Sequence, residues 1–296
     1  MSTILSNRVQ KVKPSATMAV SDKAKELKSQ GIQIISMGSG EPDFDTPTNI
    51  QKAAIHAIGA GETRYTPADG TAELKKAVCE KFKRENGLDY SANEVMVSCG
   101  GKQVFYNLCQ AILNEGDEVI IPSPYWVSYP DMAILADATP IFIDAGLDQD
   151  FKISPEQLEA SITSKSKLLV LNSPSNPTGS VYSRSEIEAL GVVLERHPNV
   201  FIISDDIYEH IRWGDDEFVN IAMACPKLKD RTVILNGVSK AYAMTGWRIG
   251  YAAGPEVVIK AMKKIQGQST SNPSSISQAA ALEAITGDQS FIKMMV

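Results

Sequence analysis

Short apolar runs and longer amphipathic stretches alternate along most of this chain of 296 residues. The apolar runs have strand length and are rich in Val and Ile, so they predict buried strands. The predicted strands cover residues 32–37, 94–98, 118–122, 140–144, 167–171, 200–204, 232–235 and 248–253. Helical spacing of apolar residues predicts helices over residues 14–30, 49–60, 71–86, 102–113, 255–266 and 276–285. Because strands and helices alternate from about residue 94 to residue 254, we expect an α/β fold with a mostly parallel sheet covered on both faces.

Local signals support several helix boundaries. Gly31 follows the first predicted helix, as expected of a C-cap. Ser154 begins a further helix, with an N-cap serine, a proline at the first helical position and an acidic first turn. Ser183 and Glu186 have the spacing of a capping box, which predicts the start of another helix.

One lysine, Lys240, lies between two of the predicted buried strands. The run 232–235 breaks at Asn236 and Gly237, and the next run starts at Arg248 after a glycine-containing turn. Lys240 could be an ordinary surface residue, since lysine is rarely buried unpaired. Alternatively, burial lowers the pKa of an amine and makes it a nucleophile toward a carbonyl carbon, as in a Schiff-base lysine. Arg248 favours the second interpretation, because its planar guanidinium suits a phosphate held bidentately.

The segment 239–251, with the sequence SKAYAMTGWRIGY, closely resembles the lysine signature of class I aminotransferases, which depend on pyridoxal 5′-phosphate (PLP). The resemblance covers nearly the whole chain and is closest to the bacterial and plastid branch of aspartate aminotransferases, which includes prephenate aminotransferases. It implies the fold of fold-type I PLP enzymes and a covalent PLP on Lys240. The implied reaction moves an amino group between aspartate and a 2-oxo acid such as 2-oxoglutarate, with glutamate and prephenate as further candidate substrates.

The resemblance also implies roles for residues that follow the predicted strands. Asp205 would keep the pyridine nitrogen of PLP protonated, which makes the ring an electron sink; from its position alone it could also cap a helix. Tyr208 and Asn176 would bond to the phenolic oxygen of the cofactor. Lys240, once released by the substrate amine, would act as the general base. We therefore predict Lys240, Asp205 and Tyr208 as the catalytic residues.

A phosphate cup is predicted at Gly100 and Gly101, between a strand and a helix. Free backbone N–H groups and the helix dipole hold phosphate in such a place. A glycine pair alone is weak evidence, but it gains weight beside Lys240 and Arg248. By the resemblance, Tyr65 would reach the phosphate of a neighbouring subunit, which implies a homodimer with shared active sites; it could otherwise be ordinary loop packing.

Five positions are expected to line the cofactor ring or the substrate. Trp126 would stack on the pyridine ring, although a core aromatic is the usual role of tryptophan. Gly40 would offer its backbone to the substrate carboxylate, although it could simply be a turn residue. Thr17 and Lys102 match positions that accompany acceptance of dicarboxylates, including prephenate, while Lys102 also lies beside the phosphate cup and could instead be a surface residue at a helix start. Asn176 and Trp126 are expected to contact substrate as well as cofactor.

Composition sets limits on other functions. A content of 43% hydrophobic and 22% charged residues is typical of a globular protein with a sizeable core. The net charge of −6, without blocks of like charge, argues against nucleic acid or an anionic membrane as a partner. No run has transmembrane length and the first residues lack a signal-peptide pattern, so we expect a cytoplasmic protein. The 4 cysteines and 3 histidines show no metal-ligand spacing, and we predict no metal site.

The resemblance assigns residues 1–48 to an N-terminal arm and part of a small domain, and residues 49–296 to the large PLP-binding domain. Members of the family are longer, and their C-terminal part carries the arginine that clamps the substrate α-carboxylate. An apolar cluster over residues 291–296, without a C-cap signal, agrees with an interrupted sequence. We therefore expect the chain to be part of a longer aminotransferase, able to bind PLP but slow in turnover. Alternatives are an aromatic or alanine aminotransferase, or a catalytically silent protein with the PLP fold.

Overall fold

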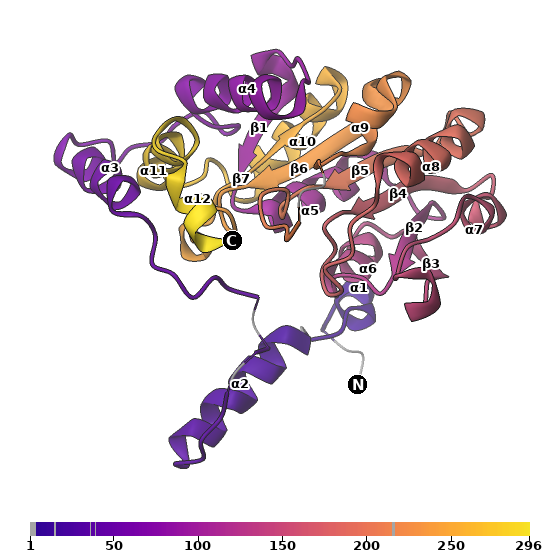
Figure 1. The fold of residues 1–296 in the computed structure, drawn as a ribbon, viewed down its shortest axis with the longest axis horizontal. Helices are drawn as coiled ribbons and strands as arrows, with labels where there is room; N and C mark the ends of the chain where they lie inside the picture. Colours follow the sequence, from indigo (N-terminus) through magenta and orange to yellow (C-terminus); the bar gives the residue numbers. More distant parts are fainter. Residues whose placement is uncertain (1–3, 15, 36, 39, 215–216) are drawn as a thin grey trace.

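The computed structural model of the chain describes residues 4–14, 16–35, 37–38, 40–214 and 217–296. Its centre is a seven-stranded sheet with the order β1-β7-β6-β5-β4-β2-β3 (Figure 1). The strands are β1 (Val95–Ser98), β2 (Glu118–Ser123), β3 (Thr139–Asp144), β4 (Ser166–Asn172), β5 (Phe201–Asp205), β6 (Thr232–Gly237) and β7 (Gly250–Ala253). Strands β2 to β6 are parallel to one another, and β7 is antiparallel to both β1 and β6. The expected mostly parallel sheet is confirmed.

Both faces of this sheet are buried. Successive residues of β4 point to opposite sides, with Leu168 and Val170 in one core cluster and Leu169 and Leu171 in another. One face is covered by α5 (Gly101–Ile112), α6 (Ser128–Leu135) and α10 (Glu256–Ser269). The opposite face is covered by α4 (Ala72–Asn86), α7 (Pro155–Ser161), α8 (Arg184–Arg196) and α11 (Ser275–Thr286). Burial on both sides explains why the central strands are continuous apolar runs in the sequence.

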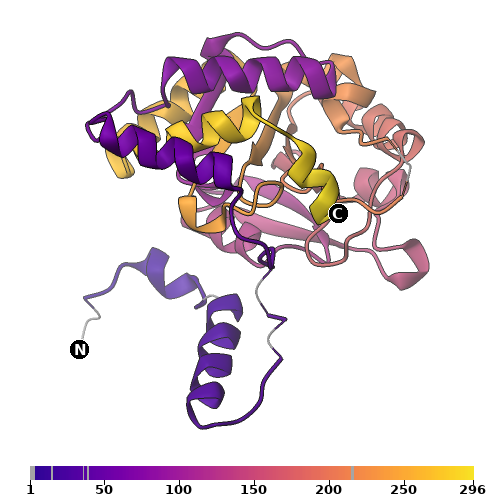
Figure 2. The ribbon, with the colours of Figure 1, turned by 60° about the vertical axis from the view of Figure 1, so that its left-hand side comes forward.

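The first helices lie outside this layered body. Helix α1 (Asn7–Lys11) lies beside α6 (Figure 1), and α2 (Ala16–Ser29) extends away from the sheet (Figures 1 and 2). An ion pair of 2.7 Å between Arg8 and Asp137 attaches α1 to the C-terminal end of α6. The division into residues 1–48 and 49–296 stays a prediction.

One predicted strand is wrong. Where the structure describes the run 32–37, at residues 32–35 and 37, the backbone forms no strand. The side chains of Ile35 and Met37 are 92% and 90% exposed. A strand needs a neighbouring strand and a buried face, and apolar residues alone supply neither.

The remaining elements are α3 (Thr48–Gly59), α9 (Ile221–Ala224), α12 (Ser290–Met295) and the 3-10 helices Ala92–Glu94, Leu147–Gln149, Pro226–Arg231 and Thr245–Trp247. Helix α3 differs from the prediction by one residue at each end, whereas α9 and the 3-10 helices were not predicted. Strand β7 begins later than predicted, because Arg248 has a left-handed backbone with φ 56°. Helix α6 was not predicted, since it contains Pro130 and has no clear polar face. Within the described residues, no helix is long and apolar enough to cross a membrane.

Candidate active site

The site lies where three adjacent parallel strands end. Strands β4, β5 and β6 pair in parallel, so their carboxyl ends share one edge of the sheet. Asp205 is the last residue of β5, while Asn176 and Lys240 lie in the loops that follow β4 and β6. Ligands of α/β sheets bind at such edges. The fold therefore brings together residues that are far apart in the sequence.

Lys240 occupies the centre of this group. Its Nζ donates a hydrogen bond to the carbonyl oxygen of Gly40 and lies 5.7 Å from the ring centroid of Tyr208. Burial lowers the pKa of Lys240; the charge of Glu41 opposes this change, and that of Arg248 adds to it. A lowered pKa increases the share of neutral amine, the form that attacks a carbonyl carbon.

Asp205 is a buried carboxylate with two protein donors. Its side chain is 4% exposed. The hydroxyl of Tyr129 donates to Oδ2 at 2.6 Å, and the backbone N–H of Ile207 donates to Oδ1 at 3.3 Å. Burial raises the pKa of Asp205 to about 6, and the bond from Tyr129 is the largest effect that opposes burial. Asp205 thus suits a cationic ring N–H as partner.

Tyr129 is a residue of the site that the sequence did not reveal. It lies in α6, three positions after Trp126, and the two rings meet edge to face with centroids 5.2 Å apart. Its ring also packs against Phe105 of α5 at 4.9 Å. A short apolar helix with an internal proline gave no signal of a polar role. Only the position of Tyr129 in a helix next to Trp126 could have indicated it.

Tyr208 and Asn176 face each other across the site. Burial raises the pKa of Tyr208 to about 12, the charge of Asp205 adds to this rise, and a hydrogen bond with Asn176 opposes it. Asn172 orients the loop that carries Asn176: its Oδ1 accepts from the N–H of Asn176 at 2.8 Å, and its Nδ2 donates to the carbonyl oxygen of Asp205 at 2.8 Å. The pair Asn176 and Tyr208 can therefore bond to one phenolic oxygen.

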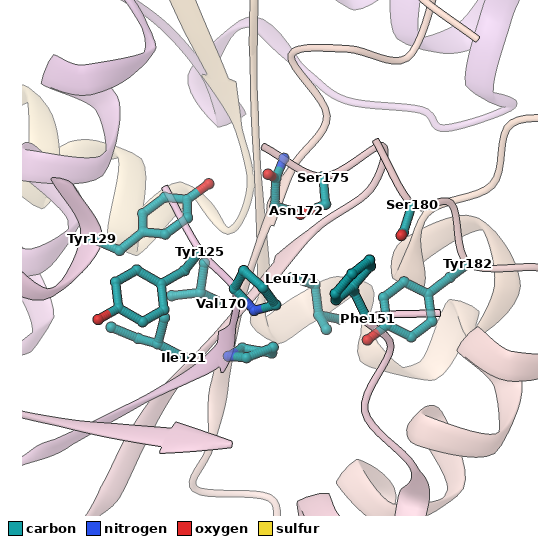
Figure 3. A pocket seen from close by; sticks show the side chains of 12 residues that line it. Ile121, Tyr125, Tyr129, Phe151, Val170, Leu171, Asn172, Ser175, Ser180 and Tyr182 are labelled. Atoms are coloured by element: carbon teal, nitrogen blue, oxygen red, sulfur yellow. The ribbon is translucent and has the colours of Figure 1, made fainter. Parts of the chain in front are cut away.

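A small cavity lies beside Tyr129 and Asn172 (Figure 3). Its volume is about 20 Å³, and its lining includes Tyr125, Tyr129, Asn172 and Ser175. Tyr129 and Asn172 are also the side chains that bond to Asp205. This volume suits about one water molecule and is too small for a cofactor. The cavity is therefore part of the surroundings of the side chains that hold Asp205 in place, and it is not a cofactor pocket.

The glycines and Arg248 form a cradle for a phosphate. Gly100 caps α5 with a left-handed backbone, φ 85°, and offers no side-chain cap to the first N–H groups of the helix. A Cβ on Gly100 would lie 2.1 Å from Nη2 of Arg248. Close by along the chain, Ser98 Oγ is buried and has no hydrogen-bond partner among the described residues. A helix N-terminus, an arginine and a spare hydroxyl donor fit the phosphate of PLP.

Lys102 lies at the rim of this cradle. Its Nζ is 5.2 Å from the ring centroid of Trp126, so the two predicted side chains are neighbours. Burial lowers the pKa of Lys102, and the charge of Arg248 lowers it further. A partly desolvated ammonium beside the cradle is suited to pair with a carboxylate.

One predicted residue does not join the site in this single chain, and another lies outside the described side chains. Tyr65 is 92% exposed, on the loop between α3 and α4. Thr17 belongs to α2, but its side chain is outside the part of the chain that the structure describes. The remaining predicted residues gather around Lys240, Asp205 and the cradle.

The comparisons with known proteins agree with this geometry. A model of the family "Aminotransferase class I and II" matches residues 32–296. The chain is 59% identical to an aspartate/prephenate aminotransferase of Nitrosomonas europaea, over 99% of this chain and 74% of that protein. It is equally identical, at 59%, to the enzyme of that name from Cereibacter sphaeroides, over 97% of this chain and 72% of that protein.

Solved structures are similar as well. The aspartate aminotransferase from Rhizobium meliloti superposes with a TM-score of 0.96 at 48% identity, over 99% of this chain and 73% of that one. The aspartate aminotransferase from Thermus thermophilus with maleate has a TM-score of 0.95 at 46% identity, over 99% of this chain and 76% of that one. The chain therefore belongs to the class I and II aminotransferases, with the fold-type I architecture and the PLP dependence that its lysine segment predicts.

Proposed function

We propose that this chain is an aspartate aminotransferase that also accepts prephenate. The names of its relatives support this substrate pair. The proposal rests on one observation, the proximity of Lys240 and Asp205 beyond the ends of β6 and β5. The Lys240 amine is partly desolvated, the Asp205 carboxylate is buried, and the two groups are close enough for their charges to interact. PLP, when bound, supplies an aldehyde for the amine and a ring that stores electron density.

Lys240 has two tasks in this proposal. It binds the cofactor covalently, and it moves a proton at the substrate Cα once the substrate amine has released it. Both tasks need a neutral amine at working pH, and burial of Lys240 together with the nearby charge of Arg248 favours that form. From the N-terminal segment, the carbonyl oxygen of Gly40 accepts a hydrogen bond from Lys240, and the charge of Glu41 opposes the fall in the pKa of Lys240.

The other residues bind and orient. Asp205 holds the proton on the ring nitrogen, and Tyr129 fixes its carboxylate. Tyr208 and Asn176 donate to the phenolic oxygen, and Trp126 stacks on the ring. Gly100, Gly101 and Arg248 bind the phosphate.

Substrate selection is proposed for Gly40, Lys102 and Thr17. The backbone of Gly40 binds the α-carboxylate, and the Lys102 ammonium pairs with a distal carboxylate. The position of the Lys102 ammonium, 5.2 Å from the ring centroid of Trp126, and its lowered pKa support this role. Thr17 is proposed from the resemblance alone.

A homodimer with shared sites is part of the proposal. Tyr65 is 92% exposed, and Ile55 and Ile58 of the preceding helix α3 are 67% and 55% exposed. Together with Trp247, these isoleucines line an apolar hollow on the surface. An apolar patch next to an exposed tyrosine is suited to a second copy of the chain. Tyr65 of one copy would then reach the phosphate of the other. The expected cytoplasmic setting stays a prediction.

Trapping the cofactor tests the proposal. The protein is incubated with PLP, reduced with borohydride and mapped by peptide mass spectrometry; we expect a phosphopyridoxyl group on Lys240 and none in Lys240→Ala. Amino-donor screening with 2-oxoglutarate then separates aspartate from aromatic and alanine activity. Labelling of another lysine, or no transfer from any donor, would refute the proposed function.

A further inference from the structure

A group of charged and amide side chains lies buried behind Tyr208, outside the proposed reaction. We call it the Glu209 cluster; its members are Lys81, Asn86, Glu209, His210 and Asn236. The side chains of Lys81 and Glu209 are 1% and 4% exposed. Lysine and glutamate are almost never buried so completely unless they are paired. The cluster therefore needs a physical explanation.

The carboxylate of Glu209 joins its own turn to a helix and a strand. Lys81 of α4 donates to Oε1, and Asn236 of β6 donates to the same oxygen at 2.7 Å. Asn86, at the end of α4, donates to Oε2 at 3.0 Å and accepts from Lys81 at 2.9 Å. The N–H of Glu209 closes the turn by donating to the carbonyl oxygen of Asp206 at 2.9 Å. One carboxylate thus holds three parts of the fold in register.

The cluster already contains its cation. Glu85, Glu209 and His210 could offer ligand atoms within 4.8 Å of one another. However, the ammonium of Lys81 bonds to Glu209 and lies 3.5 Å from Glu85. Burial opposes ionisation of Glu209, but the charges of Lys81 and His210 outweigh it and lower the pKa of this carboxyl. The centre is a buried ion pair rather than a metal site.

Stability alone does not explain such a pair. Removing two charges from water is costly, and an apolar pair of similar size is often equally or more stabilising. The position of the pair suggests another role. Glu209 directly follows Tyr208, and Asn236 precedes Lys240 by four residues. The Tyr208 ring and the Lys240 amine, 5.7 Å apart, therefore extend from two segments that are fixed to the same carboxylate.

We propose that the Lys81–Glu209 ion pair is a positioning device for the active site. It fixes the turn 206–211 and the segment 237–240, and so holds the Tyr208 hydroxyl and the Lys240 amine in one relative geometry. The inference rests on the proposed function, in which these two groups act on PLP. Lys81 and Glu209 act through Tyr208 and Lys240 and contact neither cofactor nor substrate.

The test replaces the ion pair by an apolar pair, in Lys81→Met/Glu209→Met. The matched control is Leu158→Ala in α7, a buried residue of the core cluster at the other end of the sheet. Backbone hydrogen exchange is measured on the protein without cofactor. In the double variant, we expect hydrogen exchange in segments 206–211 and 237–240 to become at least about tenfold faster. In Leu158→Ala, exchange in these two segments should stay unchanged. Wild-type exchange in a folded double variant would overturn the proposal.

A second variant keeps the test decisive if the double variant does not fold. Asn236→Ala removes one donor to Glu209 and keeps both charges. Because Asn236 Oδ1 also accepts from the N–H of Gly237 at 2.7 Å, Gly237 is left out of the readout, and we expect faster exchange confined to 206–211 and 238–240. Wild-type exchange there in Asn236→Ala would likewise count against the proposal.

The PLP-loaded protein gives an independent readout. The pH midpoint of the cofactor absorbance change should shift in the ion-pair variant and stay in place in Leu158→Ala. An unshifted midpoint would overturn the positioning role. If the wild-type protein takes up no PLP on Lys240, the proposed function fails, while hydrogen exchange still decides whether the ion pair fixes the two segments.

Discussion

The hydroxyl of Tyr129 donates a hydrogen bond to Oδ2 of Asp205 across 2.6 Å, and both side chains are buried. Burial raises the pKa of Asp205 to about 6, and this bond opposes the rise. The bond from Tyr129 therefore offsets part of the effect of burial and keeps the pKa of Asp205 close to neutral pH. Tyr129 belongs to α6 and Asp205 to β5, so the packing of α6 beside β5 affects the ionisation of Asp205.

Tyr129→Phe should move the pH dependence of turnover. Loss of the donor raises the pKa of Asp205 further, so the active, ionised carboxylate forms only at higher pH. We expect the acidic limb of the kcat profile to shift upward by about one pH unit or more, since a charge-assisted bond contributes about 1.5–3 kcal/mol. Tyr182→Phe is the control, because its buried hydroxyl bonds to the N–H of Ile153 instead. A profile that matches the wild type would show that Tyr129 does not affect Asp205.

Asp205→Asn should stabilise the protein without cofactor while it abolishes transamination. The carboxyl has a pKa of 3.8 when unperturbed and about 6 in the fold, so the folded protein binds more protons between these values. Stability contributed by this group is therefore lost as the pH rises from about 4 to about 6. Asp205→Asn has no carboxyl to titrate. Its free energy of unfolding should therefore exceed that of the wild type by at most about 3 kcal/mol at pH 7 and by almost nothing at pH 4. Urea unfolding at both pH values measures the difference; an equal effect at both would contradict the assignment.

The sequence predicted the residues at the strand ends better than the residues packed around them. Lys240 and Arg248 lie in a segment that resembles a known family signature, and the predicted strands before Asp205 and Lys240 end at the same edge of the parallel sheet. Tyr129 was missed, because its role depends on how α6 packs beside β5. The Glu209 cluster was missed for the same reason: Lys81 and Glu209 lie far apart in the sequence, and nothing local marks either as buried. The wrong strand at 32–37 shows that apolar composition does not provide a pairing partner.

Gly250→Ala tests the phosphate cradle through the backbone. A Cβ at Gly250 would lie 2.4 Å from the nitrogen of Gly101 and 2.5 Å from the carbonyl carbon of Gly100. Since backbone atoms cannot give way as a side chain does, the start of α5 must move. We expect a loss of about 2 kcal/mol or more in unfolding free energy, together with weaker PLP binding, measured by calorimetry and cofactor titration.

Gly267→Ala is the matched control for this glycine. Gly267 lies in α10 with no atom within 4 Å of an added Cβ, so alanine should stabilise the helix by about 0.5–1 kcal/mol. PLP affinity should not change in this variant. Equal PLP affinity in the two alanine variants would show that the cradle tolerates a displaced backbone.

Lys102→Ala should weaken dicarboxylate substrates selectively. The ammonium lies 5.2 Å from the ring centroid of Trp126 and near the charge of Arg248, so a distal carboxylate that pairs with it would lose a charge-assisted contact of about 1.5–3 kcal/mol. We expect kcat/KM for aspartate and prephenate to fall by about tenfold or more, while transfer from alanine, which has no second carboxylate, stays nearly constant. Lys76→Ala, in which an exposed lysine of α4 is removed, should change none of these values. If aspartate and alanine lose activity in the same proportion, Lys102 supports the phosphate cradle instead of selecting the substrate.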